Sequence, residues 1–125
     1  MNQLFPIFVK LNQIDTLLVG GGKVALEKFQ ALISNDEGLK LTIVTREIIP
    51  EFKELLQNYT QIQLHMRPFR PDDLTDKQLV IAATNNMELN EQLRNLTGQN
   101  NILFNAADKP ELCDFYLGSI VKKGD

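Results

Sequence analysis

The stretch Thr16-Leu-Leu-Val-Gly-Gly-Gly-Lys-Val-Ala25 decides the fold of this chain. A short apolar run leads into three consecutive glycines, and apolar residues then recur at helical spacing. In this G-x-G-x-x-A pattern, Gly20 permits a tight turn out of a strand and Gly22 leaves the backbone open to close approach. Ala25 is small enough for a helix to pack closely on a sheet. The stretch therefore predicts the first strand, turn and helix of an α/β domain.

The rest of the chain alternates between strand and helix patterns, which is typical of an α/β layer fold. Asn85 or Asn86 is expected to cap the last helix, and residues 105–114 are expected to form a loop. The expected helices cover Lys23–Ser34, residues 48–56 and the stretch that follows Asn86. The expected strands are Thr16–Val19, Leu39–Val44, Gln61–Met66, Leu79–Ala83 and Ile102–Phe104.

The strands differ in how much of their surface is apolar. Residues 16–19 and 79–83 are continuously apolar, as in strands covered on both faces, whereas Gln61–Met66 alternates and looks half exposed. A sheet of order 3-2-1-4-5 predicts this contrast, because the third strand is then an edge. We therefore expect one domain, residues 1–125, with a Rossmann-type doubly wound parallel sheet and three α/β/α layers. Leu4–Leu11 contains Pro6 and is expected to be an edge segment or a covering loop.

The glycine turn predicts a site for the pyrophosphate of a dinucleotide, over Gly20, Gly21 and Gly22. The helix that begins near Lys23 directs free N–H groups and its positive dipole end at such an anion. A P-loop is excluded, because Val24 stands where that motif needs Ser or Thr. After the second strand, Glu47 favours ribose hydroxyls, and Arg46 either favours a 2′-phosphate or lines the adenine pocket. The alternative is that these two residues form a solvated charge pair at the start of a helix.

Composition limits the partners. The chain has 13 basic and 16 acidic residues and a formal net charge of −3, so nothing indicates binding to nucleic acid. One cysteine excludes an internal disulfide and fits a reducing cytoplasm. No signal peptide or membrane span is indicated, and we expect a cytoplasmic protein. No cluster of metal ligands is visible either, since His65 is the only histidine and Cys113 the only cysteine.

Five segments together resemble the precorrin-2 dehydrogenase/sirohydrochlorin ferrochelatase family, specifically the N-terminal domain of siroheme synthase. The segments are Leu4–Leu11, Val19–Lys28, Leu79–Asn90, Asn105–Asp108 and Pro110–Phe115. The resemblance implies an NAD-dependent oxidation of precorrin-2 to sirohydrochlorin, in sirohaem or cobalamin biosynthesis. In many members it also implies insertion of Fe(II), and Co(II) is the other candidate metal substrate. The family continues beyond this sequence into a dimerisation region and a helical domain, so a homodimer is expected of the full-length form.

The resemblance also implies roles for individual residues. The family's essential aspartate corresponds to Asp108, which would act as general base. Cofactor contacts correspond to the glycine turn and to residues that follow the first, second and fourth strands, namely Lys23, Val24, Arg46, Glu47 and Thr84. Asn105 would either bind the nicotinamide carboxamide or hold the loop backbone.

Two classes of function remain open at this level. One is an NAD-dependent dehydrogenase with Asp108 as its catalytic residue. The other is a nucleotide-binding regulatory module without catalysis, because the same fold serves several functions. In the second class, Asp108 would only stabilise the turn before Pro110.

Overall fold

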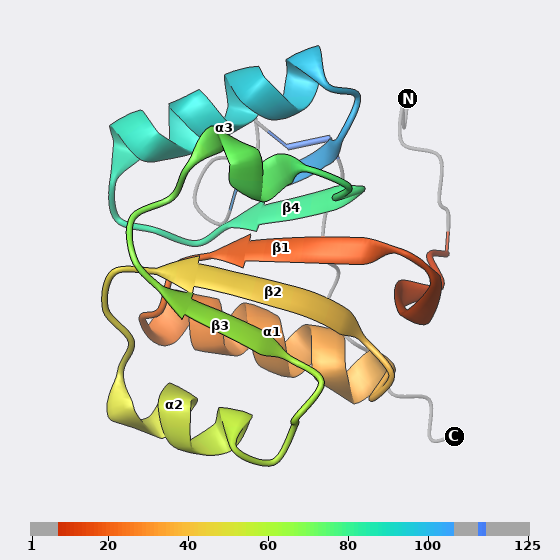
Figure 1. Cartoon of the computed structure of the whole chain (residues 1–125), viewed down its shortest axis with the longest axis vertical. Helices are drawn as coiled ribbons and strands as arrows, with labels where there is room; N and C mark the ends of the chain where they lie inside the picture. The colour runs from red at the N-terminus through yellow and green to blue at the C-terminus, as the bar shows by residue number, and fades with distance from the viewer. Residues whose placement is uncertain (1–7, 107–112, 115–125) are drawn as a thin grey trace, which may run out of the picture.

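The computed structural model describes residues 8–106 and 113–114. Parallel strands form a single sheet in the order β3-β2-β1-β4-β5, with helices on both faces (Figure 1). The strands are β1 (Asp15–Val19), β2 (Lys40–Thr45), β3 (Gln63–Met66), β4 (Leu79–Ala82) and β5 (Leu103–Ala106). The helices are α1 (Lys23–Asn35), α2 (Pro50–Leu56) and α3 (Met87–Gln99), with the 3-10 turns η1 (Leu11–Gln13) and η2 (Pro71–Leu74). The predicted Rossmann-type fold and strand order are confirmed.

The side chains of the central strands alternate between two cores, as the pleat of a strand requires. Leu18, Ile43 and Ile81 face α1 and α2, where Phe29 packs against Phe52 with ring centroids 5.5 Å apart. On the other face, Leu93 of α3 and Leu74 of η2 pack against strand residues, namely Leu17, Val19, Val44, Val80 and Phe104. The sheet is thus covered on both faces, in the three layers expected.

The burial of the strands agrees with their positions in the sheet. Every residue of β4 is buried, and in β1 only Asp15 is exposed. In β3 no residue is fully buried, and Met66 is 48% exposed. The sequence predicted this contrast because an edge strand has one neighbour and only part of each face covered.

The fifth strand corrects one prediction. The sequence indicated a strand over 102–104 followed by a loop from Asn105, but β5 extends to Ala106. Asn105 pairs with Ile81 and Ala106 with Ala82, so the ladder with β4 overrides the turn preference of Asn. Ile102 instead bonds through its N–H to the carbonyl of Thr97, at the end of α3.

The segment expected as an edge or a cover lies partly outside the described ranges. Residues 8–10 are exposed and without regular structure, and Leu11 begins η1 with its side chain buried. None of the helices within the described ranges has both the length and the apolar character that crossing a membrane requires.

The structure selects Asn86, rather than Asn85, as the N-cap of α3. The Asn86 side chain accepts a hydrogen bond of 3.0 Å from the N–H of Leu89. We expect Asn86→Ala to lower the free energy of unfolding by about 0.5–2 kcal/mol, the usual cost of losing such a cap. Urea denaturation checks this, with Asn85→Ala as the matched control on the neighbouring exposed residue. Equal effects of the two substitutions would contradict the assignment.

Candidate functional site

The glycine turn begins where the ends of β1, β2 and β4 meet. Gly20 donates its N–H to the carbonyl of Val44 at 3.0 Å, which continues the ladder to β2. Its φ of +131° suits glycine, and a Cβ at this position would overlap the carbonyl oxygen of Ala83, just after β4. Only glycine fits here, because both the positive φ and the neighbouring Ala83 carbonyl exclude a side chain. This is the steric cause of the tight turn expected from the sequence.

Gly21 serves a packing role that the sequence did not indicate. A Cβ here would overlap the carbonyl oxygen of Glu47 and lie 2.8 Å from the hydroxyl of Thr45. The Gly21 carbonyl accepts a bond of 2.9 Å from the N–H of Ile49, and Thr45 donates its hydroxyl to the Glu47 carbonyl at 2.6 Å. Gly21 thus allows the loop between β2 and α2 to lie directly on the glycine turn. Its predicted contact with a cofactor stays a prediction.

Gly22 differs from its two neighbours. It is the N-cap of α1, with φ −91° and ψ −162°, a conformation open to any residue. No atom of the described protein lies within 4 Å of the Cβ that another residue would carry. Gly22 therefore has no steric reason within the described chain to be glycine, and the close approach of a ligand would be one.

The start of α1 is suited to an anion. No side chain caps it, and its first turn has no acidic residue. The first amides of a helix have no acceptor within the helix, and here Lys23 and Val24 lie exposed beside them. At α3, by contrast, Asn86 caps the helix and Glu88 stands in the first turn. Of these two helices, which begin at the same edge of the sheet, α1 presents uncapped amides and an uncompensated positive dipole end and α3 does not.

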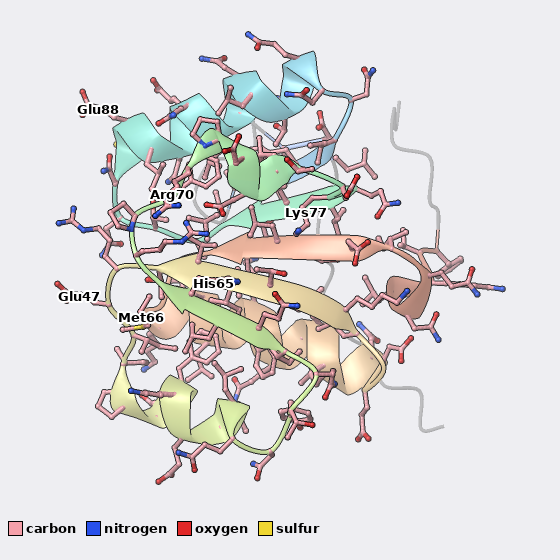
Figure 2. The ribbon with its side chains drawn as sticks, in the orientation of Figure 1. Glu47, His65, Met66, Arg70, Lys77 and Glu88 are labelled. Atoms are coloured by element: carbon pink, nitrogen blue, oxygen red, sulfur yellow. The ribbon has the colours of Figure 1, made fainter. Side chains whose placement is uncertain are left out.

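Arg46 and Glu47 lie exposed in the loop that follows β2. In Figure 2 the Glu47 side chain points away from the strand ends into solvent. The Glu47 carbonyl accepts a hydrogen bond from the Thr45 hydroxyl, which holds the backbone of this loop beside the glycine turn. The side chains of Arg46 and Glu47 remain exposed, so a ligand can reach them. This arrangement fits the ribose end of a dinucleotide.

Thr84 lies after β4, and its polar groups already have partners in the protein. Its hydroxyl donates to Oδ1 of Asn90 at 2.6 Å, and Asn90 returns a bond of 3.2 Å to the Thr84 carbonyl. The N–H of Asn86 also bonds to the hydroxyl, at 3.1 Å. Sequence reasoning missed Asn90, although a polar residue on a face that packs against the sheet is the signal that could have found it. Thr84 and Asn90 fix the start of α3 against β4.

The remaining predicted residues lie on the β5 side of the edge. Asn105 is buried in β5 at 4% exposure, with its amide nitrogen 3.5 Å from the sulfur of Cys113. Asp108 lies outside the described residues. Among the residues that are described, no group of three or more His, Cys, Asp or Glu side chains could hold a metal ion.

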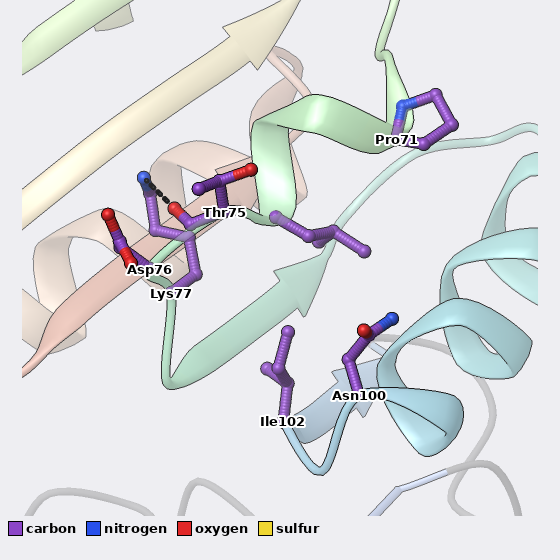
Figure 3. Close-up of a pocket in the computed structure, with 7 residues that line it drawn as sticks. Pro71, Thr75, Asp76, Lys77, Asn100 and Ile102 are labelled. Carbon is purple, nitrogen blue, oxygen red and sulfur yellow. Dashed lines mark hydrogen bonds between the residues drawn. The ribbon is translucent and has the colours of Figure 1, made fainter.

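A hollow of about 260 Å³ lies at the opposite edge of the sheet, before β4 and β5 (Figure 3). It lies between η2 and the end of α3, and Lys77, Asn100 and Ile102 are among the residues that line it. The Lys77 ammonium bonds weakly, at 3.5 Å, to the carbonyl of Thr75. Open α/β sheets bind ligands at the carboxyl ends of their strands, so this hollow at the amino ends is not the candidate site.

One ion pair stabilises the crossover from β3 to β4. The Arg67 guanidinium donates two hydrogen bonds to Asp73, of 2.9 and 2.6 Å. The hydrogen bond and the positive charge of Arg67 hold the pKa of Asp73 below its usual value. Asp73 in turn raises the pKa of Arg67. The N–H of Arg70 also bonds to Asp73, so the pair fixes the start of η2.

The different surroundings of Gly21 and Gly22 give a sharp test. Gly22→Val meets open space, so its thermal unfolding temperature should stay near that of the wild type while NAD affinity, measured by calorimetry, falls strongly. Gly21→Ala should instead destabilise the protein, because its Cβ meets backbone that cannot move freely. Full NAD affinity in Gly22→Val would contradict the placement of the pyrophosphate.

Comparison with known proteins agrees with the fold. The family model described as putative NAD(P)-binding matches residues 7–119. Siroheme synthase of Nitrosomonas eutropha is 36% identical over 119 residues, which are 95% of this chain and 25% of the relative. Siroheme synthase 3 of Aeromonas hydrophila is 39% identical over 118 residues, 94% of this chain and 25% of the relative.

The chain therefore spans about a quarter of the length of these siroheme synthases. Among solved structures, SirC, a precorrin-2 dehydrogenase, matches with a TM-score of 0.72 and 23% identity, over 94% of this chain and 54% of that one. This likeness supports the fold. The glycine turn, the uncapped helix beside it and the match over most of the chain lead to one conclusion: the chain belongs to the putative NAD(P)-binding family.

Proposed function

We propose that this chain binds NAD and serves the NAD-dependent dehydrogenation of precorrin-2 to sirohydrochlorin. The observation that carries the proposal is the start of α1, where Gly22 has no steric neighbour and no side chain caps the helix. The siroheme synthase relatives support the reaction, and SirC shares the fold. The relatives are named siroheme synthase, which favours an enzyme over the regulatory module.

The proposed NAD contacts lie after the ends of three strands, β1, β2 and β4. The amides of Lys23 and Val24 bind the pyrophosphate, with Gly20, Gly21 and Gly22 beneath it. Arg46 and Glu47 contact the adenosine ribose, and the backbone at Thr84 borders the cofactor while its hydroxyl stays bonded to Asn90. Asn105 lies two strands from β1 in the sheet, on the side where the nicotinamide would lie.

When bound, NAD accepts the hydride. The protein must then orient the tetrapyrrole and remove a proton, and we assign the proton to the carboxylate of Asp108, which follows β5 in the chain. In members that insert Fe(II) or Co(II), the same carboxylate would receive pyrrole protons. The homodimer and the cytoplasmic location expected from the sequence stay predictions.

We expect NAD to bind more tightly than NADP, because Glu47 repels a 2′-phosphate. Glu47→Gln should raise NADP affinity and Arg46→Ala should lower it, each by at most about fivefold, since exposed ion pairs contribute about 0.2–1 kcal/mol. Parallel titrations of the two nucleotides measure this. Tighter binding of NADP that disappears in Arg46→Ala would reverse the assignment.

Asp108→Asn keeps the shape of the side chain but cannot accept the proton. Measured in the full-length protein, it should retain NAD affinity and lose about 10²–10⁴-fold in the rate of precorrin-2 oxidation. Cofactor fluorescence and single-turnover absorbance separate the two effects. A variant that oxidises precorrin-2 at the wild-type rate would leave Asp108 as a turn residue before Pro110.

A further inference from the structure

The buried face of α3 carries polar side chains where a surface helix usually has apolar ones. Its buried residues are Asn90, Leu93 and Thr97, at the spacing of one helical face. The Thr97 hydroxyl bonds within its own helix, to the carbonyl of Arg94 at 3.1 Å. Asn90 differs, because its side chain bonds to a residue outside α3. The polar group of Asn90 therefore joins two segments of the chain.

Asn90 holds Thr84 at two points. The Thr84 hydroxyl donates to Oδ1 of Asn90 at 2.6 Å, and Nδ2 of Asn90 donates to the Thr84 carbonyl at 3.2 Å. Because the amide group is planar and presents its acceptor and its donors in fixed directions, the two bonds set the orientation of Thr84 as well as its distance. Asn90 is only 7% exposed, so water competes little for these bonds.

Thr84 follows the residue that borders the glycine turn. The Ala83 carbonyl oxygen lies where a side chain at Gly20 would begin, and the N–H of Ala83 donates to the carbonyl of Val19 at 2.8 Å. The chain after β4 thus runs directly against the turn that begins the candidate pyrophosphate site. A shift of Thr84 would move this backbone relative to Gly20. Through Thr84, Asn90 controls where the loop of residues 83–86 lies.

Stability alone does not call for a polar pair at this place. Replacing both partners of a buried hydrogen bond by apolar groups of the same shape is often nearly neutral for stability. Leucine at position 90 and valine at position 84 would have about the shapes of the present side chains. Hydrogen bonds are directional, however, whereas apolar contacts are not. What the pair of Thr84 and Asn90 supplies beyond packing is a defined position for the loop.

We propose that Asn90 is a positioning residue for NAD, which acts through Thr84 and holds the loop of residues 83–86 where the bound cofactor requires it. This inference rests on the proposed function. A loop that is held before the ligand arrives need not be ordered on binding, so its affinity for the ligand is higher. Asn90 itself does not touch the cofactor, and its loss raises the Kd for NAD.

The first test measures binding and turnover in the full-length protein. Asn90→Ala should raise the Kd for NAD by about 3–10-fold in calorimetry, because the loop must then be ordered on binding. It should raise KM for NAD by a larger factor than it lowers kcat. If Asn90→Ala does not fold, Thr84→Val removes the 2.6 Å bond from the other partner and should raise the Kd likewise. A Kd equal to that of the wild type would overturn the inference.

The matched control is Thr97→Val on the same helix. Thr97 is also buried, and its hydroxyl bonds to the Arg94 carbonyl near the other end of α3. Thr97→Val should therefore lower the free energy of unfolding and leave the Kd for NAD at the wild-type value, at a temperature where the variant is folded. An equal rise of the Kd in Thr97→Val and Asn90→Ala would contradict a positioning role, because affinity would then follow general stability.

A double variant separates position from stability more sharply. Thr84→Val combined with Asn90→Leu replaces both partners by apolar side chains of similar shape. The free energy of unfolding should recover part of what each single substitution loses, whereas the Kd for NAD should stay raised. If affinity recovers together with stability, packing rather than hydrogen-bond direction positions the loop, and the inference fails.

Hydrogen exchange gives a readout that does not depend on NAD. The N–H of Asn86 bonds to the Thr84 hydroxyl and the N–H of Ala83 to the Val19 carbonyl, so both amides should exchange faster in Asn90→Ala. Unchanged exchange at both amides would mean that Asn90 does not hold the loop.

These outcomes distinguish the inference from the proposed function. A full-length wild type that does not bind NAD would overturn both. A wild type that binds NAD, with Asn90→Ala binding it equally well, would overturn the inference alone. A wild type that binds NAD without oxidising precorrin-2 would overturn the proposed reaction and leave the role of Asn90 in binding intact.

Discussion

The close approach of three strand ends at Gly20 is the constraint on which the rest of the site depends. β1 lies between β2 and β4, and its last residues bond to both neighbours. At Gly20 the chain must turn out of the sheet, and the Ala83 carbonyl lies where a side chain at residue 20 would begin. The absence of a side chain lets the turn form, and the turn sets where α1 begins and which way its first amides point.

The two long helices show how local chemistry separates a structural helix start from a binding one. α1 and α3 both follow a buried central strand, and both begin at the carboxyl edge of the sheet (Figure 1). In α3 the protein satisfies the first turn itself, through Asn86. In α1 it does not, and a small anion bound there would complete the hydrogen bonds that Asn86 supplies in α3. A preference for an anion at α1 would arise because no side chain caps this helix.

Much of the polar chemistry around the glycine turn holds backbone in place rather than facing a ligand. Thr45 fixes the carbonyl of Glu47, and Thr84 with Asn90 fixes the start of α3. Buried polar side chains need hydrogen-bond partners, and here those partners are the loops that would surround a cofactor. The loops after β2 and β4 are therefore held at defined positions before any ligand arrives. Such an arrangement lowers the entropy lost on binding.

The sequence by itself determined the order of elements and the edge position of β3, and it predicted the site at Gly20–Gly22. These follow from local patterns: apolar period, glycine spacing and the contrast between continuous and alternating strands. The roles of Gly21 and Asn90 depended on tertiary structure, as did the extension of β5 through Asn105. Each depends on contacts with a residue from another part of the chain: Glu47, Thr84 and Ile81. Periodicity reports which face of an element is buried, whereas these contacts depend on strand register and loop placement, which only the folded chain sets.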